Sequence, residues 1–127
     1  MIPALFMTAQ QENKFIAAEW FEVFNTKDIE GLLSLYHEDA RHYSPKLKIS
    51  QPETNGFISG TDALRKWWAE AFERLPSLHY VPTSLTENEH RVFMEYIRRV
   101  DNEPEMLVAE VLEIRNGRII ASRVYHG

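Results

Sequence analysis

The sequence predicts one α+β domain, residues 1–127, in which helices pack on one face of a mostly antiparallel sheet. In the first half of the chain, apolar residues recur at helical spacing, and in the second half four strand-like segments follow one another. The dipeptide Asn116-Gly117 between the last two segments is typical of a type I′ turn, whose central residues both need positive φ. Helices first and hairpin-linked strands afterwards therefore indicate this fold class.

Three helices are expected before the run of strands. The first, residues 9–25, follows the capping-box pair Thr8 and Gln11, and its apolar residues lie on one face. Asp28 can cap a second, shorter helix. The third, residues 60–75, carries a broad apolar stripe and is stopped by the proline that follows it.

The pattern of strands begins after the second helix. That helix is expected to reach Tyr36, and a polar break at residues 37–39 separates it from a short strand, residues 40–44, which Pro45 ends. Residues 45–59 are expected to form an irregular hairpin or rim loop, because prolines, asparagine and glycine interrupt them. Four further strands are expected at residues 78–85, 92–100, 106–115 and 118–125.

Composition excludes several classes of function. Nineteen acidic and 14 basic side chains give a net charge of −5, the wrong sign for nucleic acid or an anionic membrane surface, so neither partner is expected. The absence of cysteine excludes disulfides and a thiolate nucleophile, and the cytoplasm is the expected location. The five glycines form no Walker loop or dinucleotide fingerprint. The start lacks the basic segment of a secretory signal, and no apolar run is long enough to span a bilayer.

Four segments, in their order and spacing, carry a resemblance to a known family: Trp20 to Pro45, Gly60-Thr61-Asp62-Ala63-Leu64, Leu75-Pro76 and Ile114-Arg115-Asn116-Gly117-Arg118-Ile119-Ile120. With them the chain resembles the NTF2-like superfamily, and within it the SnoaL-like group, which includes ketosteroid isomerases and polyketide cyclases. The resemblance implies a cone-shaped, strongly curved sheet wrapped by three helices, the NTF2-like or cystatin-like roll. It also implies a pocket at the wide end of the cone and a homodimer formed through the sheet.

The resemblance places the catalytic positions of the isomerases on three residues of this chain. The tyrosine of their oxyanion hole falls on Trp20, the aspartate base on Ser44 and the protonated aspartic acid on Glu110. A serine hydroxyl cannot take a carbon-bound proton near neutral pH, so steroid isomerisation is not expected. Epoxide hydrolases of this fold use an Asp-Arg-Asp group, to which Arg98, Arg99, Asp101 and Glu110 are a poor match.

Three titratable residues are candidates for proton transfer. His42 shares strand parity with Ser44 and is the candidate base; the alternative is a histidine at the rim, hydrogen-bonded to residues 37–39. Glu110 lies in the most apolar stretch of the predicted sheet, so it is expected to be a protonated donor or to be paired with Arg98 or Arg99 on the neighbouring strand. His126 is a candidate second proton shuttle, or a solvated residue near the end of the chain.

Seven residues are expected to contact the substrate: Trp20, Phe24, Ser44, Trp68, Phe72, Leu112 and Val124. Trp20 can offer its indole N–H to a substrate oxygen or to a backbone carbonyl. The pair Trp67-Trp68 with Phe72 can form an aromatic clamp, although such stripes usually fill a core, and at least one tryptophan is expected there.

The segment His37 to His42 resembles a zinc-protease motif, but its two histidines are five residues apart and fall off a common helical face. A looser site that used His37, Asp39 and His42 lacks support in ligand number and geometry. No metal is expected.

Two functions follow from these residues. The first is a small-molecule enzyme or carrier for an apolar, cyclic carbonyl compound. As an enzyme, His42 would take a proton, while neutral Glu110, helped by Trp20 or His126, stabilised charge on the substrate oxygen; no cofactor is required. The alternative is a non-catalytic ligand-binding or dimerisation module, with a filled cone and an exposed apolar patch.

Overall fold

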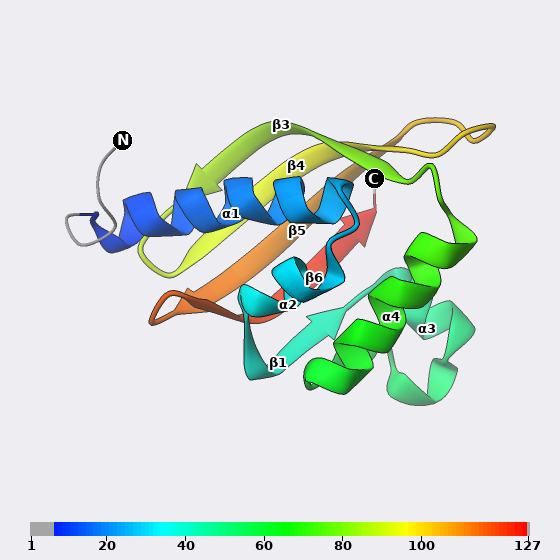
Figure 1. The fold of residues 1–127 in the computed structure, drawn as a ribbon, viewed down its shortest axis with the longest axis horizontal. Coiled ribbons are helices and arrows are strands. Elements are labelled where there is room, and N and C mark those ends of the chain that lie inside the picture. Colours follow the sequence, from blue (N-terminus) through cyan, green and yellow to red (C-terminus); the bar gives the residue numbers. More distant parts are fainter. Residues whose placement is uncertain (1–6, 127) are drawn as a thin grey trace.

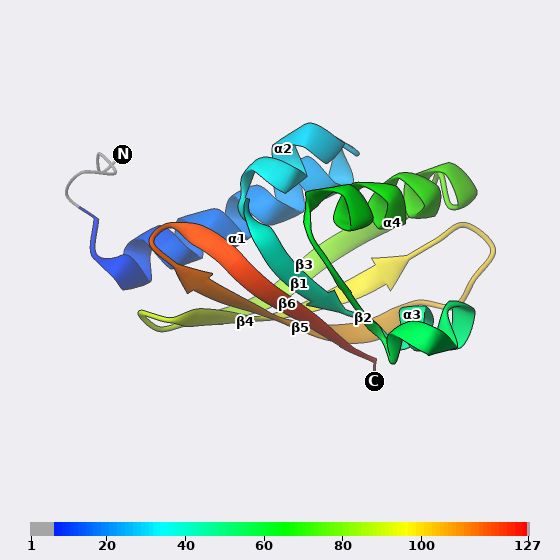
Figure 2. The ribbon, with the colours of Figure 1, turned by 90° about the horizontal axis from the view of Figure 1, so that it is seen from below.

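A six-stranded sheet with helices on one face forms the protein (Figures 1 and 2). The computed structural model describes residues 7–126. The elements are α1 (Ala9–Asn25), α2 (Ile29–Ser34), β1 (Tyr36–Tyr43), α3 (Pro45–Ser50), the 3₁₀ turn η2 (Pro52–Thr54), β2 (Phe57–Ser59), α4 (Thr61–Arg74), β3 (His79–Glu87), β4 (Arg91–Arg99), β5 (Met106–Arg115) and β6 (Arg118–His126).

The strands lie in the order β2-β1-β6-β5-β4-β3. All neighbours are antiparallel except β1 and β6, which are parallel, so the predicted α+β class with a mostly antiparallel sheet is confirmed. This order puts the last strand between the first strand and β5. Residues that are far apart in the sequence therefore share the middle of the sheet: His42 lies beside Ser122, which in turn lies beside Leu112.

The first helix begins where the capping box predicts. The Gln11 backbone N–H donates to Thr8 Oγ1 over 3.1 Å, and the Thr8 N–H donates to Gln11 Oε1 over 3.0 Å. Asp28 caps α2 through the Gly31 N–H at 2.9 Å. The long first and third predicted helices match α1 and α4 to within a residue or two at each end.

The prediction that the second helix reaches Tyr36 is wrong. Helix α2 ends at Ser34, and Tyr36 is the first residue of β1, paired with Ile119 of β6. The pairing shifts register between Tyr36 and Arg41, and the three polar residues in between are exposed. Residues 37–39 therefore belong to a strand with a local irregularity and do not separate two elements. Because all three side chains are polar and point outward, the alternation of apolar and polar residues that marks a strand is absent there.

Residues 45–59, predicted as an irregular hairpin or loop, form the helix α3, the turn η2 and the strand β2. With α3, the described residues 7–126 contain four α-helices. Ser44 caps α3 by accepting the Lys46 N–H at 3.2 Å, and Pro45 occupies the first turn, where its missing N–H costs nothing. The same proline therefore ends a strand and begins a helix. Strand β2 then pairs with β1 at the edge of the sheet.

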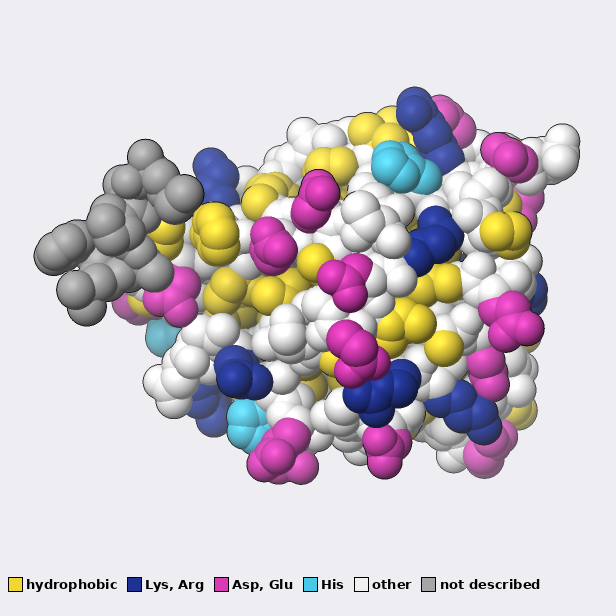
Figure 3. All heavy atoms as spheres, in the orientation of Figure 1, with side chains coloured by type: hydrophobic (Ala, Val, Ile, Leu, Met, Phe, Trp, Pro, Cys, Tyr) yellow, Lys and Arg dark blue, Asp and Glu magenta, His cyan; other side chains and the backbone are white. Residues whose placement is uncertain are grey.

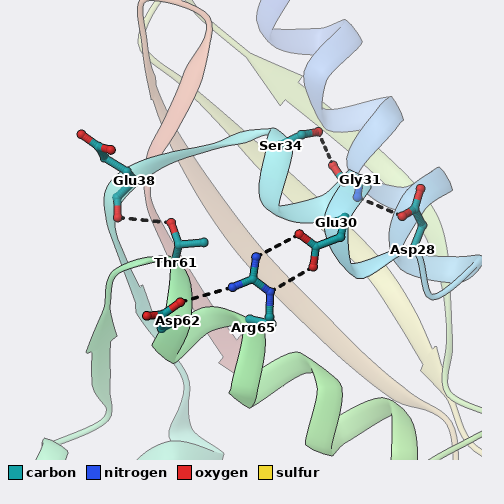
Figure 4. Close-up of polar contacts among 8 residues, drawn as sticks. All are labelled: Asp28, Glu30, Gly31, Ser34, Glu38, Thr61, Asp62 and Arg65. Carbon is teal, nitrogen blue, oxygen red and sulfur yellow. Dashed lines mark hydrogen bonds and ion pairs between the residues drawn. The ribbon is translucent and has the colours of Figure 1, made fainter.

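Helices α2 and α4 are joined at the surface by Arg65. Its guanidinium binds Glu30 of α2 at 2.9 Å and Asp62 of its own helix at 3.3 Å (Figure 4). These side chains are exposed, so the pairs fix the relative position of the helices more than they add stability. On this helical face acidic and basic side chains are interspersed (Figure 3).

The core lies between the sheet and α1, α2 and α4. Trp20 is at its centre, stacked on Phe24 with ring centroids 5.0 Å apart. The opposite face of the sheet is left uncovered by helices (Figure 2). In the described part of the chain, no helix is both long and apolar enough to cross a membrane.

Candidate functional site

A pocket of about 60 Å³ lies between the helices and the covered face of the sheet. Five of the seven predicted contact residues line it, together with all three candidate proton-transfer residues: Trp20, Phe24, Ser44, Trp68, Val124, His42, Glu110 and His126. Phe72 and Leu112 do not; both are buried in the core, and Phe72 packs edge-on against Phe24 at 5.0 Å. Trp67, expected as part of an aromatic clamp, also lines the pocket.

The volume of the pocket limits its ligand. A buried water needs roughly 10–15 Å³ and an engineered cavity of about 150 Å³ holds benzene, so about 60 Å³ lies between these cases. The lining residues Arg74 and His126 are exposed, whereas His42 and Glu110 are buried, so the pocket has a solvent-facing mouth and a sheltered end. A ring-sized ligand is therefore expected to lie partly in the mouth, with only part of it in the sheltered end.

Glu110, on the inward face of β5, is 1% exposed. The Tyr96 hydroxyl donates to its Oε1 at 2.8 Å, while its Oε2 is buried and has no hydrogen-bond partner among the described residues. Burial raises the pKa of Glu110 to about 8, against a smaller lowering by the Tyr96 hydrogen bond. Glu110 is therefore mainly protonated at neutral pH and leaves one oxygen for a ligand.

The alternative ion pair of Glu110 with an arginine is wrong. Strand β4 turns Arg98 inward, where it binds Glu103 at 2.9 Å, and Arg99 outward, where it binds Glu105. The sequence alone does not show which arginine faces inward. Apolar residues occupy both faces of β4, with Ile97 on the outward face, so alternation does not identify the inward one.

His42 is 2% exposed, and its Nδ1 lies 2.7 Å from Ser122 Oγ. The Tyr36 hydroxyl donates to the same Ser122 oxygen at 3.0 Å, which leaves the single Ser122 hydroxyl proton for Nδ1 of His42. Nδ1 is thus the acceptor, and the proton of the neutral ring is on Nε2. Burial lowers the pKa of His42 to about 4, so the ring stays neutral at physiological pH.

The direction of this chain of hydrogen bonds starts at Trp20. An indole nitrogen only donates, and Trp20 Nε1 donates to the Tyr36 hydroxyl oxygen at 3.1 Å. The Tyr36 proton is then directed to Ser122, and that of Ser122 to His42. The Trp20 N–H therefore binds neither a backbone carbonyl nor a ligand. The alternative of a rim histidine bonded to residues 37–39 is also wrong, because His42 is fully buried against Ser122.

Tyr80 and Tyr96 are pocket residues that the sequence analysis does not name. Tyr96 and Tyr80 line the pocket and stack with centroids 4.2 Å apart. Burial, followed by the nearby Glu110, raises the pKa of both hydroxyls, so they remain protonated donors. Strand parity was the available signal for Tyr96, since it pairs with Val108, two residues before Glu110 and on the same face.

Basic residues are a second group that lines the pocket, and of its three members only Arg98 is named in the sequence analysis. Lys46 of α3, Arg74 of α4 and Arg98 of β4 all line the pocket. Lys46 lies in the segment predicted as a loop, which gives no indication of where its side chain lies. Ser44, the neighbour of this group, is buried and its hydroxyl caps α3.

The candidate metal ligands do not form the group considered from the sequence. His37, Glu38 and Asp39 come within 4.8 Å of one another, all exposed on β1, while His42 is on the buried face. Exposed acidic groups of this kind are common without an ion, and these three residues do not line the pocket.

Comparisons with known proteins identify the family. The family model for the SnoaL-like domain matches residues 17–122. Among curated proteins, no sequence matches this chain.

Solved structures share the fold. A SnoaL-like protein of unknown function from Burkholderia thailandensis is 20% identical, with a TM-score of 0.82 over 91% of this chain and 94% of its own. TerC, co-crystallised with polyporic acid, is 19% identical, with a TM-score of 0.79 over 91% and 92%. An NTF2-like protein of unknown function from Cytophaga hutchinsonii is 15% identical, with a TM-score of 0.71 over 91% and 89%. The chain therefore has the NTF2-like α+β fold and belongs to the SnoaL-like domain family.

Proposed function

We propose that the protein is an acid–base enzyme that binds a small cyclic carbonyl compound in the pocket and moves a proton next to the carbonyl group. One observation carries the proposal: two buried titratable side chains line the same pocket, Glu110 with a buried Oε2 that has no hydrogen-bond partner in residues 7–126, and His42 with Nδ1 occupied by Ser122 and Nε2 not used in any hydrogen bond there. A buried polar atom without a partner costs free energy, which a ligand that supplies the partner recovers.

The hydrogen bonds favour a division of roles opposite to the one that the sequence predicts. His42 accepts from Ser122 at Nδ1, so its Nε2–H is a donor that can stabilise negative charge on a carbonyl oxygen without becoming charged itself. Glu110, with a pKa of about 8, can take a proton as carboxylate and return it as acid. We therefore assign the donor role to His42 and proton transfer to Glu110.

Other predicted features fit this proposal without being required by it. The chemistry needs no cofactor or metal. His126 lies at the mouth, where burial and the neighbouring Lys46 and Arg98 lower its pKa, and its role as a second proton shuttle stays a prediction. A cytoplasmic location also stays a prediction, which fractionation of the native host would test.

The proposal is tested by deuterium uptake at the α-carbon of cyclohexanone and cyclohex-2-enone in D₂O, followed by NMR. We expect protein-dependent exchange whose rate rises as the pH approaches about 8, because the carboxylate of Glu110 is the active form. Glu110→Gln should reduce the exchange by at least about a hundredfold. Both ketones should still raise the melting temperature of the variant.

The control is Glu113→Gln, on the outward face of the same strand, where Glu113 pairs with Arg123 at 2.7 Å; it should leave exchange unchanged. A rate that falls as the pH passes 8 would return the role of base to His42, with Glu110 as the acid. No exchange and no change in melting temperature with either ketone would remove the enzymatic proposal.

The second candidate, a dimerisation module, is favoured by the uncovered face of the sheet. Phe93, Leu107 and Tyr125, from three adjacent strands, are exposed there, and Leu107 is 70% exposed. Exposed apolar groups on neighbouring strands favour an interface. We propose a homodimer formed through this face, which is compatible with an active pocket on the other face.

Leu107→Glu should convert this dimer to a monomer in sedimentation velocity, because a carboxylate would have to be buried at the interface. Ile49→Glu is the control, since Ile49 is 81% exposed and lies on α3 rather than on the sheet. A wild-type protein that sediments as a monomer at high concentration would contradict the proposed dimer.

A further inference from the structure

Three cationic side chains line the pocket, although the chain carries a net charge of −5. We call this group, Lys46, Arg74 and Arg98, the cationic mouth. The three residues come from α3, α4 and β4, so the fold rather than local sequence brings them together. Positive charge concentrated at a mouth attracts anions to it.

Arg98 is the most informative member because its side chain is buried. The residue is 4% exposed, and within residues 7–126 the only side-chain hydrogen bond of its guanidinium is to Glu103, which accepts from Nη1 at 2.9 Å. A guanidinium has five N–H donors in a planar fork, so most of them are left for other partners. Glu103 is itself largely solvated, with its side chain 44% exposed, and compensates the buried charge only in part.

Lys46, on α3, is surrounded by the same excess of positive charge. Burial lowers its pKa, and the charges of Arg98 and Arg74 lower it further, against a smaller opposing effect of Glu103. The mouth therefore holds three cations for one partly exposed carboxylate. An anion placed between Lys46 and Arg98 would relieve this imbalance.

We propose that the ligand of this pocket is a carboxylic acid, whose carboxylate lies in the cationic mouth against Arg98 and Lys46 while its ring reaches toward Glu110. A carboxylate matches the planar fork of a guanidinium with two parallel hydrogen bonds. The inference rests on the proposed function, which it narrows from cyclic carbonyl compounds to cyclic keto acids.

The experiment compares 3-oxocyclohexane-1-carboxylate with its methyl ester by calorimetric titration at neutral pH. The two probes share the ring and the ketone and differ in charge. We expect the acid to bind about ten- to a hundredfold more tightly than the ester. Raising the salt concentration should weaken binding of the acid and leave that of the ester unchanged.

Substitutions test which side chains cause the expected difference in affinity between the acid and the ester. Lys46→Ala should reduce the affinity for the acid by about tenfold and leave the ester unchanged, while the control Lys48→Ala, exposed on the same helix, should affect neither. Glu103→Gln should strengthen binding of the acid several-fold, because it removes the carboxylate that competes for Arg98. This opposite change separates recognition of charge from damage to the fold.

An ester that binds as tightly as the acid would overturn the carboxylate site and leave the proposed enzyme intact. Equal losses for both probes in Lys46→Ala would overturn it as well, since the lysine would then hold the pocket's shape. If neither probe binds and neither ketone binds, the carboxylate site and the proposed function fall together.

Discussion

Glu110→Gln is expected to remove a pH-dependent loss of on the order of 4 kcal/mol in the free energy of unfolding, which the wild type undergoes between about pH 4.5 and 8. The pKa of Glu110 is raised from 4.5 to about 8 in the folded protein. Below pH 4.5 the carboxyl group is protonated in both states and its burial is not penalised by charge. As the pH rises to 8, the unfolded chain ionises first, so the wild type loses stability that a neutral glutamine keeps.

The contribution of His42 to stability has the opposite pH dependence, and the two contributions together determine how the free energy of unfolding of the wild type varies with pH. Its pKa is lowered from 6.5 to about 4, so stability is present above pH 6.5 and is lost as the pH falls toward 4. Between about pH 4.5 and 6.5 the two effects oppose each other, because folding adds a proton to Glu110 and removes one from His42. Above pH 6.5 only the loss from Glu110 continues.

Urea unfolding of the wild type, Glu110→Gln and the outward-facing control Glu113→Gln between pH 4.5 and 8.5 measures this effect. The difference between the wild type and Glu110→Gln should grow steadily over that range, and Glu113→Gln should show no such growth. A difference that is constant with pH would mean that Glu110 titrates normally, and the proton-transfer role would lose its support.

Ser122→Ala is the second large expected effect, a loss of about 2–6 kcal/mol in the free energy of unfolding. The substitution removes both the acceptor of the Tyr36 hydroxyl and the donor to His42 Nδ1, at 3.0 and 2.7 Å. Two buried polar groups are then left without partners, each costing about 1–3 kcal/mol. Ser84→Ala, at an exposed position of β3, should change stability by less than about 0.5 kcal/mol.

The same variant tests the tautomer of His42. In the wild type, ¹⁵N NMR should show an unprotonated Nδ1 and a protonated Nε2 at neutral pH, unchanged down to about pH 5 because the pKa is about 4. In Ser122→Ala the preference for Nε2–H should be lost. A proton on Nδ1 in the wild type would reverse the chain of hydrogen bonds and return the lone pair of Nε2 to the pocket as a base.

Helix starts and tight turns were predictable from the sequence, because they are determined by residues only a few positions apart. The capping box at Thr8 and the turn at Asn116-Gly117, where φ is 52° and 75°, act over a few residues, and both are as expected. Pro45 predicts the end of a strand, but a proline is equally favourable in the first turn of a helix, and here it serves as both. The irregular, outward polar stretch after Tyr36 interrupts the strand pattern, and the sequence therefore predicts that Tyr36 ends a helix.

Strand parity predicts which side chains of one strand share a face, but not which residues of distant strands lie together. The apolar residues around Glu110 predict a carboxyl group that is either protonated or paired, and the family resemblance marks the same position; parity alone does not decide between the two. Parity could not show that Ser122 lies against His42, since the two are 80 residues apart and pair in parallel through a strand order that no local pattern encodes. Nor could it show that Arg98 faces the pocket while Arg99 binds Glu105 outside.

The position of β6 between β1 and β5 also determines when the pocket can form during folding. Until β6 is in place, β1–β2 and β3–β5 are separate pieces of sheet, and joining them closes a loop of some 80 residues. Contacts between such distant segments form slowly, because the entropy of the loop is lost before the contacts are gained. We therefore expect the pairing of His42 with Ser122 to appear late in refolding, after the hairpins of β3, β4 and β5.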